Sequence, residues 1–593
     1  MLLDKTIDLH ADQLPSDIRQ GNPENFRFRI PKLTIGDSEP VELPAPGVTV
    51  VVGGNNVGKS TLLRQIYATL QSPTLQNTQQ PSVLTEIHGN IWVGSNADLA
   101  QWVLTDADIH GAGYQAQVRK STIVASLGSL RNLAEQPTPS HMAPWFVDHR
   151  TALDRHSLCV PTARRSGIEQ PPSHPIHVLE TSAQLLGELQ SVAHDLFGLD
   201  LTLDRISGDI GIRVGTPNAA VPLIDQVTDD YVQALAALPY LSEQGDGVQS
   251  ALGLLLPIVT GTHPVMLIDE PEAFLHPPQA RRLGRAIARI AQNRRSQVIV
   301  ATHDTNFLQG LVEESPDVAI LHLARDGNHS EAKLLPSEDV RELWADPVLR
   351  YSNALDGLFH AAVIVTENDR DSHFYAAAID SARKVAADQS PAPNIMFLAA
   401  HGKTNIAPLA ARLGKLGVRV ISTPDLDVLN DKTVLETLVN AHGGDWTTIE
   451  PLYDKATAQF RQPTHRPKRE TVAASIAAHF ASLDPDSQFT NDDARTVKEI
   501  TKVEGPWSEL KRFGTMAFRN DKESAQALLA RLDEIGIVTV RVGELENFLT
   551  TANAKKGPGW LTTALNAGAH ETQVALDHAR RLLTASGHQL PPT

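Results

Sequence analysis

A glycine-rich segment has the residue types and spacing of a phosphate-binding loop. It reads G-x-x-x-x-G-K-S from Gly53 to Ser60, and it lies between an apolar run at 47–54 and a helix-like pattern that starts at Lys59. In such a loop, backbone N–H groups surround phosphate oxygens, the lysine reaches the terminal phosphates and the serine can ligate Mg²⁺. We therefore expect ATP to bind here. The candidate ATP-binding residues of this segment are Gly53, Asn55, Asn56, Gly58, Lys59, Ser60 and Thr61.

Two adjacent acids follow an apolar run about two hundred residues later. Asp269 and Glu270 end the run at 264–270. Asp269 is expected to hold Mg²⁺ with Ser60, and Glu270 is expected to polarise the attacking water. The next apolar run, 296–304, ends near His303, which we expect to contact the γ-phosphate, although a strand-end histidine alone is more often structural.

Four further acids lie at the ends of apolar runs in the C-terminal half. Glu367 follows "AVIVT", Asp371 lies four residues later, and Asp425 and Asp427 form an Asp-x-Asp pair after "VIST". Parallel strands deliver such loops to one edge of a sheet, and alternate residues of an extended pair point the same way. Carboxylates that converge repel each other unless cations lie between them, and such oxygen ligands suit Mg²⁺ or Mn²⁺. Two ions there could activate water against a phosphodiester, although each acid alone could be an ordinary turn or helix-cap residue.

The elements that position these residues suggest two α/β domains. Apolar runs alternate with helical patterns in both halves, which is typical of parallel sheets covered on both faces. We expect an ATPase domain over residues 1–350, with an insertion at about 90–235, and a second α/β domain over 351–593. A mostly helical insertion with its own small core is expected at about 432–533, before a last strand-like run at 535–549.

The first domain resembles the ABC-type P-loop ATPase heads of the SMC-like group. "YLSEQGDGVQSAL" (240–252) lies where that group has its signature motif, with Ser242, Gly245 and Gly247 as the matching small residues. In that architecture the signature of one subunit meets the ATP of another, so the resemblance implies a homodimer or a higher homo-oligomer. Arg150 is a further candidate phosphate or switch residue, or else a surface arginine.

The second domain resembles the TOPRIM domain of nucleases, topoisomerases and primases, through Glu-x-x-x-Asp followed by Asp-x-Asp. An ABC-type head followed by TOPRIM is similar to the overcoming-lysogeny-defect (OLD) family of ATPase-nucleases, which includes anti-phage defence proteins such as the Gabija nuclease subunit. The segments "AAHGKTNIAPLAARL" and "VRVGELENFL" resemble later parts of that domain. The resemblance implies Glu544 and Glu546 as ligands of a second metal ion, and Lys403 or Lys556 as phosphate-stabilising residues.

We therefore expect an ATP-regulated, Mg²⁺- or Mn²⁺-dependent DNA endonuclease of antiviral defence, which could act with a second defence-system protein. An SMC-like ATP-dependent DNA clamp or sensor without nuclease activity is the alternative. Primase or topoisomerase chemistry is disfavoured, because the chain has no zinc-binding cysteines and no identifiable catalytic tyrosine.

Composition limits the protein class. The chain has one cysteine, Cys159, and no apolar run near the roughly 20 residues that a membrane helix requires, so we expect a cytoplasmic protein without a membrane segment. Because the net charge is −17, we expect DNA to be contacted only by local basic patches. The candidate patches are residues 461–470 and 511–522. Either patch could instead be a solvated loop.

Overall fold

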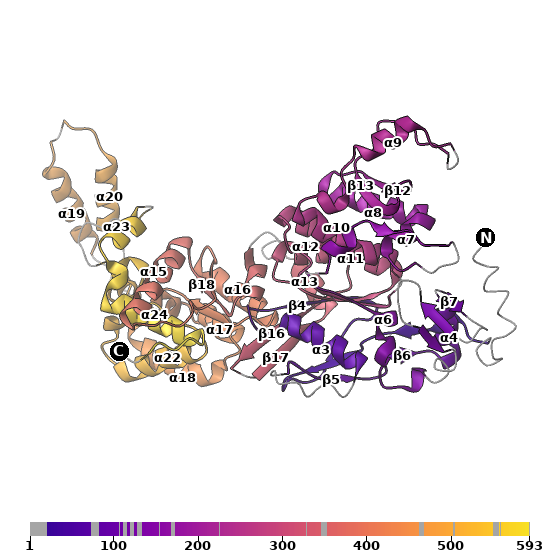
Figure 1. Ribbon diagram of the computed structural model, residues 1–593. Helices are drawn as coiled ribbons and strands as arrows, with labels where there is room; N and C mark the ends of the chain where they lie inside the picture. The colour runs from indigo at the N-terminus through magenta and orange to yellow at the C-terminus, as the bar shows by residue number, and fades with distance from the viewer. Residues whose placement is uncertain are drawn as a thin grey trace. The chain divides into compact units, whose positions relative to one another are not determined.

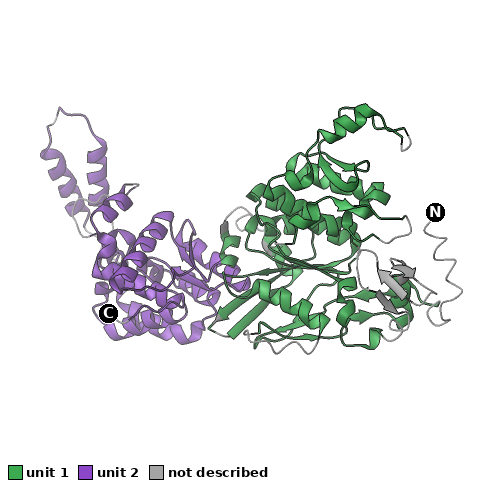
Figure 2. Ribbon diagram, in the orientation of Figure 1, with its two compact units in different colours: residues 1–359 green, residues 360–593 purple. Residues whose placement is uncertain are grey.

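The computed structural model divides into two compact units, Met1–Phe359 and His360–Thr593 (Figure 2). The sequence placed this boundary near residue 350. The structure describes residues 20–72, 82–105, 107–110, 115–118, 124–126, 133–152, 154–167, 172–223, 226–261, 263–327, 329–345, 353–461, 468–484, 486–501, 505–549, 557 and 559–591.

Unit 1 is built on a six-stranded sheet in the order β10-β14-β15-β4-β16-β17. Its strands are β4 (Gly47–Val52), β10 (Val147–Arg150), β14 (Val265–Asp269), β15 (Gln297–Ala301), β16 (Val318–Asp326) and β17 (His329–Leu335). All neighbours pair in parallel except β16 and β17. Figure 1 shows helix α3 (Lys59–Gln71) on one face of this sheet, with α10 (Asp246–Thr260), α11 (Pro277–Arg294) and α12 (Thr305–Glu314) on the other. This arrangement confirms the expected ABC-type ATPase fold.

The strand β10 corrects the expected insertion at 90–235. It pairs in register with β14, from Val147 opposite Val265 to Arg150 opposite Ile268, so this stretch contains a strand of the central sheet. Its sequence "VDHR" is polar because β10 is an edge strand, and it therefore lacks the apolar run that marks the inner strands.

Smaller antiparallel sheets complete unit 1. They contain β1 (Arg27–Phe28) with β6 (Trp92–Val93), and β2 (Lys32–Ile35) with β3 (Val41–Glu42) and β5 (Leu84–His88). Further sheets contain β7 (Ala107–His110), β8 (Gln115–Val118) and β9 (Val124–Ser126), and β11 (Thr162–Ala163), β12 (Leu201–Asp204) and β13 (Asp209–Val214). Helices α4 (Asn96–Thr105), α6 (Ala143–Phe146), α7 (Pro175–Thr181), α8 (Ala183–Phe197), α9 (Asp229–Ala236) and α13 (Ser337–Ala345) lie between or after these strands.

Unit 2 has a parallel sheet in the order β19-β18-β20, formed by β18 (Ala362–Thr366), β19 (Ile395–Ala399) and β20 (Val420–Thr423). Parallel bridges from Ser422 to Ile537 and from Asp425 to Val540 add the expected strand-like run beside β20. Helices α15 (Asp369–Val385), α16 (Lys403–Lys415), α23 (Trp560–Asn566) and α24 (Gln573–Ala585) accompany the sheet. One core is formed largely by α15, α24 and the strand residues that face them.

The expected helical insertion is present between β20 and Ile537. It contains α17 (Lys432–Ala441), α18 (Trp446–Thr457), α19 (Arg469–Ala481), α20 (Asn491–Thr501), α21 (Ser508–Phe513) and α22 (Lys522–Glu534). Apolar residues of α18 and α22 are buried, whereas none of α19 is. Among the described residues, no helix combines the length and apolar character needed to cross a bilayer.

Candidate nucleotide and metal sites

The phosphate-binding loop joins β4 to α3 as the sequence predicts. The strand is apolar and buried along Val48–Val52, and the turn after it contains Asn56 and Gly58 with positive φ angles of 63° and 102°. Lys59 Nζ donates to the carbonyl oxygens of Gly53 and Gly54, both at 2.9 Å. Burial lowers the pKa of this ammonium, although nearby acids oppose the shift. Asn55 lies in the same turn, and Thr61 lies in the first turn of α3.

The two adjacent acids contact residues of the phosphate-binding loop and of the next strand end. Ser60 Oγ donates to Asp269 Oδ1 at 2.9 Å, which brings the two expected Mg²⁺ ligands together from β14 and α3. Glu270 has φ 47°, and its side chain is half-exposed. His303 Nδ1 lies 3.8 Å from Glu270 Oε1, so the structure brings the expected γ-phosphate contact and the expected base together.

Two buried residues at this site were not found from the sequence. Glu272 Oε1 lies 3.1 Å from His303 Nδ1 and accepts the His303 backbone N–H at 2.9 Å, and burial raises the pKa of Glu272. Arg155 is fully buried and donates to the Asp269 carbonyl oxygen and to Ser250 Oγ on α10. Glu272 could have been suspected as a third acid within four residues, but no spacing singles out Arg155.

Arg150, the arginine that the sequence offered as a phosphate or switch residue, pairs with Asp148 at 2.7 Å. The structure shows it on the edge strand β10.

The signature-like segment leads into α10. Ser242 lies in a 3-10 turn, η6 (Leu241–Glu243), Gly245 is the N-cap residue of α10, and Gly247 lies in its first turn, where a Cβ would come within 2.7 Å of the Phe274 carbonyl oxygen. The helix therefore begins after the serine and the first glycine, as expected.

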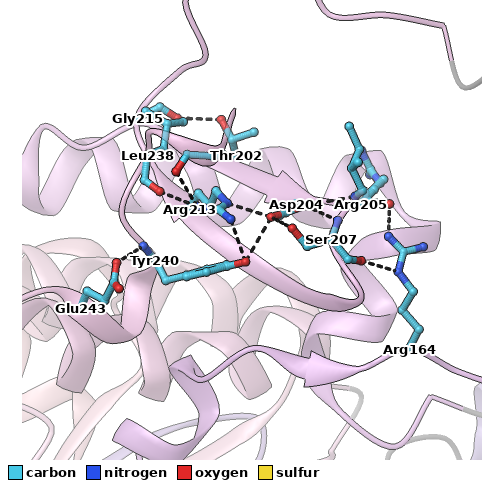
Figure 3. Close-up of polar contacts among 12 residues, drawn as sticks. Arg164, Thr202, Asp204, Arg205, Ser207, Arg213, Gly215, Leu238, Tyr240 and Glu243 are labelled. Atoms are coloured by element: carbon cyan, nitrogen blue, oxygen red, sulfur yellow. Dashed lines mark hydrogen bonds and ion pairs between the residues drawn. The ribbon is translucent and has the colours of Figure 1, made fainter. Parts of the chain in front are cut away.

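A polar cluster holds Tyr240 at the start of this segment (Figure 3). Arg213 Nη2 donates to Tyr240 Oη at 2.8 Å, and Arg213 Nε donates to Asp204 Oδ2 at 2.8 Å. Asp204 is fully buried; burial opposes its ionisation, but hydrogen bonds from Ser207 and Arg213 lower its pKa to about 2. The β12–β13 hairpin thus fixes Tyr240, two residues before Ser242 of the signature-like segment.

Three of the four predicted acids of unit 2 converge at the carboxyl edge of its sheet. Ligand oxygens of Glu367, Asp425 and Asp427 all lie within 4.8 Å of one another, a separation that one divalent ion could bridge. Glu367 directly follows β18, and its Oε1 accepts the Asp425 backbone N–H at 3.2 Å. Burial, with the charges of Glu367 and Asp371, raises the pKa of Asp425 to about 9. Burial likewise raises the pKa of Glu367.

The geometry of the Asp-x-Asp pair corrects the expected extended conformation. Asp425 is the N-cap residue of a 3-10 helix, η8 (Leu426–Asn430), and Asp427 lies inside that helix. The two carboxylates converge because the chain turns after β20, and their convergence does not come from strand alternation.

Asp371 is not a member of this three-acid group. It lies in the first turn of α15, where its Oδ2 accepts the Asn368 backbone N–H at 2.8 Å as part of a capping box. The helix-cap role therefore applies to this acid, and the expected four-acid convergence is reduced to three. Burial, with the charges of Glu367 and Glu546, raises the pKa of Asp371 to about 7, so it remains within electrostatic range of the group.

Glu544 and Glu546, which the resemblance suggested as ligands of a second metal ion, have different surroundings. Glu544 is buried, and its Oε2 lies 3.6 Å from Lys511 Nζ. Glu546 lies in the 3-10 helix η11 (Leu545–Phe548), and its charge acts on Asp371. Neither belongs to the three-acid group found among the described residues, so their role as ligands of a second metal stays a prediction.

Lysines approach the same acids. Lys403, the first residue of α16, places Nζ 3.5 Å from Asp427 Oδ2. Lys511, which the sequence suggested only as part of a basic patch, lies 3.5 Å from the same oxygen. Lys556 lies outside the described residues.

These residues suit a divalent cation. Three carboxylates whose oxygens share one small volume repel each other unless positive charge is supplied, and carboxylate oxygens are preferred ligands of Mg²⁺ and Mn²⁺. In unit 1 the Ser60–Asp269 pair, beside the phosphate loop, suits the Mg²⁺ that accompanies ATP.

The chain is similar to known proteins over parts of its length. Residues 181–309 match a family model described as "AAA domain, putative AbiEii toxin, Type IV TA system". The Old nuclease of Escherichia phage P2 is 22% identical over 178 residues, which cover 29% of each chain. The uncharacterized protein MJECL11 of Methanocaldococcus jannaschii is 28% identical over 103 residues, or 17% of this chain and 90% of that protein.

Among solved structures, an Smc head bound to the C-winged helix domain of ScpA is 15% identical, with a TM-score of 0.33, and the match covers 52% of this chain and 98% of that one. The chain spans less than a third of the Old nuclease in the matched region. The match to the Old nuclease, together with the nucleotide-site motifs and the ABC-type sheet, makes this chain similar to the overcoming-lysogeny-defect (OLD) family of ATPase-nucleases.

Proposed function

We propose that this protein binds and hydrolyses ATP in unit 1 and cleaves DNA phosphodiesters with divalent metal ions in unit 2, which we interpret as a TOPRIM domain. The observation that carries the nuclease proposal is the convergence of Glu367, Asp425 and Asp427 at one sheet edge. Its nuclease-family relative and the pair of lysines beside Asp427 support it.

In the ATP site, each residue has a distinct task. Lys59 would leave the loop carbonyls to bind the β- and γ-phosphates, and Ser60 with Asp269 would hold Mg²⁺. Glu270 would orient the attacking water, while His303, held by Glu272, would contact the γ-phosphate.

In the nuclease site, Glu367, Asp425 and Asp427 would hold Mg²⁺ or Mn²⁺, with Asp371, Glu544 and Glu546 as the acids available to a second ion. Bound ions supply a nucleophilic hydroxide at neutral pH and stabilise the leaving oxygen. The carboxylates fix the position of that chemistry, and Lys403 balances their charge and can contact a phosphate. Without cations the same acids would repel DNA.

We further propose that two copies close on ATP through Ser242, Gly245 and Gly247, and that nucleotide state controls cleavage. An antiviral role is consistent with the toxin–antitoxin description of the matched family model. A second defence-system protein as a partner stays a prediction.

A cleavage assay on supercoiled and linear DNA tests this proposal. Wild-type protein with Mn²⁺ or Mg²⁺ should cut DNA, and Asp425→Asn and Asp427→Asn should each reduce the rate by about a hundredfold or more because each removes a ligand charge. The exposed Asp484→Asn is the matched control, and ATPase activity should persist in all three variants. If the protein hydrolyses ATP but cleaves no DNA under any nucleotide or metal condition, the nuclease proposal is wrong and the DNA-clamp function is favoured.

A further inference from the structure

Lys511, a residue of the helical insertion, forms ion pairs with two acids of the candidate metal site, Asp427 and Glu544. Its Nζ is 3.5 Å from Asp427 Oδ2 and 3.6 Å from Glu544 Oε2. Asp427 is therefore approached from two sides, by Lys403 from the first turn of α16 and by Lys511 from α21. The two carboxylates that Lys511 joins, Asp427 and Glu544, lie 117 positions apart in the sequence, so α21 contacts two separate loops of the site.

Backbone contacts fix α21 at this position. Asn547 Nδ2 donates both to the Lys511 carbonyl oxygen at 2.7 Å and to the Val542 carbonyl oxygen at 2.8 Å, so one side chain ties the insertion to the turn before η11. A Cβ at Gly543 would come within 2.4 Å of the Lys511 carbonyl oxygen, so glycine at 543 permits this close approach. Leu510 is fully buried beside it. These contacts fix the backbone of Lys511 beside the acids, and its flexible side chain then reaches Asp427 and Glu544.

Other cations of the same basic run are engaged elsewhere. The Arg512 guanidinium lies 5.2 Å from the centre of the Phe513 ring, and Arg519 Nη2 pairs with Glu509 at 3.3 Å. The run at 511–522 is therefore not a uniform basic patch, since its first residue faces the acids of the proposed nuclease site.

We propose that Lys511 belongs to the nuclease site, where it pairs with Asp427 and Glu544, competes with divalent ions for these carboxylates and contacts a DNA phosphate when such ions displace it. This inference rests on the proposed nuclease function. An ammonium within 3.5 Å of Asp427 Oδ2 competes with a divalent ion for that oxygen. Lysine is also a compact phosphate-binding charge on a flexible stem, so it can move from one partner to the other. The helical insertion would thus supply a phosphate-binding residue to the sheet edge.

The sign of the effect on metal binding separates this role from a structural one. In Lys511→Met full-length protein, Mn²⁺ measured by electron paramagnetic resonance should bind about tenfold more tightly, because a competing positive charge is gone. DNA cleavage at saturating Mn²⁺ should nevertheless fall by about a hundredfold, because the phosphate contact is lost. Lys511→Arg should restore part of the cleavage, and Lys511→Gln repeats the charge removal with a polar side chain. The exposed Lys522→Met, in the same insertion, is the matched control and should leave both quantities unchanged.

Each remaining outcome decides against a specific claim. If wild-type protein binds Mn²⁺ and cuts DNA while Lys511→Met and Lys511→Gln bind Mn²⁺ as wild type does or more weakly, the role of Lys511 is overturned and the nuclease proposal stands. If wild-type protein neither binds Mn²⁺ in unit 2 nor cuts DNA, the proposed function itself fails, and with it this inference.

Discussion

At the scale of single residues, Glu272 organises the end of the ATP site. It is buried, and one of its oxygens meets both the backbone N–H and the ring Nδ1 of His303. This contact favours the tautomer of His303 that carries its proton on Nδ1, so Nε2 is the ring nitrogen that is available to the γ-phosphate.

Substitution of Glu272 should therefore displace His303 and leave the phosphate-binding loop intact. We expect Glu272→Ala to lower the ATP hydrolysis rate by about tenfold to a hundredfold with little change in ATP affinity, since small displacements of catalytic groups have effects of this size. Glu272→Gln should retain part of the rate, and the exposed Glu338→Ala is the control. Steady-state hydrolysis together with binding of a fluorescent ATP analogue measures both quantities; an unchanged rate in Glu272→Ala would contradict the role.

His322 should make stability depend on pH. Burial, followed by the positive charges of Lys333 and Lys59, lowers its pKa to about 4. The unfolded chain binds a proton near pH 6.5 and the folded chain does not, so stability is complete above that pH and is lost as the pH falls toward 4.

For this single group the loss between pH 7 and pH 5 is about 2 kcal/mol. His322→Gln should therefore show a smaller decrease in the free energy of unfolding over this range than wild type, whereas the exposed His141→Gln should match wild type. Denaturant unfolding at both pH values measures the difference. Equal decreases in wild type and His322→Gln would show that this imidazole does not control the dependence.

Sequence reasoning at this scale found the groups that follow apolar runs and missed those held by distant partners. Asp269 and Glu367 could be identified because the first ends a buried strand and the second directly follows one. Arg155 and Lys511 could not, because their partners lie on segments that only the folded chain brings near.

At the scale of elements, the β12–β13 hairpin and the signature-like segment share one buried polar cluster (Figure 3). Arg213 joins Asp204 to Tyr240, and its guanidinium carbon lies 3.9 Å from the centre of the Tyr240 ring. A buried charge without its partner is strongly unfavourable.

We expect Arg213→Ala to lower the free energy of unfolding by about 3 kcal/mol, because Asp204 would lose its buried partner. The double variant Asp204→Ala/Arg213→Ala should lose less than the sum of the two single variants, with a coupling of about 1–3 kcal/mol. Denaturant unfolding of all four proteins in the cycle gives this quantity. Additive losses would mean that the two residues act independently.

The expected strands of the two parallel sheets were predictable from apolar runs, but some elements were not. The edge strand β10 is short and polar, so its pattern does not differ from that of a loop. The 3-10 helix η8 reverses the chain after β20, and no period in "DLDVLN" distinguishes it from an extended segment.

At the scale of the whole molecule, the proposed closure of two copies on ATP is open to direct measurement. Glu270→Gln should bind ATP but hydrolyse it slowly, so it should accumulate the ATP-bound dimer. Sedimentation velocity should show a nucleotide-dependent increase in mass for Glu270→Gln and none for Lys59→Ala, which lacks the phosphate-binding ammonium. The same mass with and without ATP in Glu270→Gln would contradict closure on nucleotide.

The central claim is that the carboxylates at the sheet edge of unit 2 hold divalent ions. Anomalous diffraction from crystals of the full-length protein grown with Mn²⁺ tests it most directly. We predict an anomalous peak within coordination distance of Glu367, Asp425 and Asp427 that disappears in Asp425→Asn/Asp427→Asn. Crystals that bind Mn²⁺ at the ATP site while these three side chains have no peak between them would contradict the account.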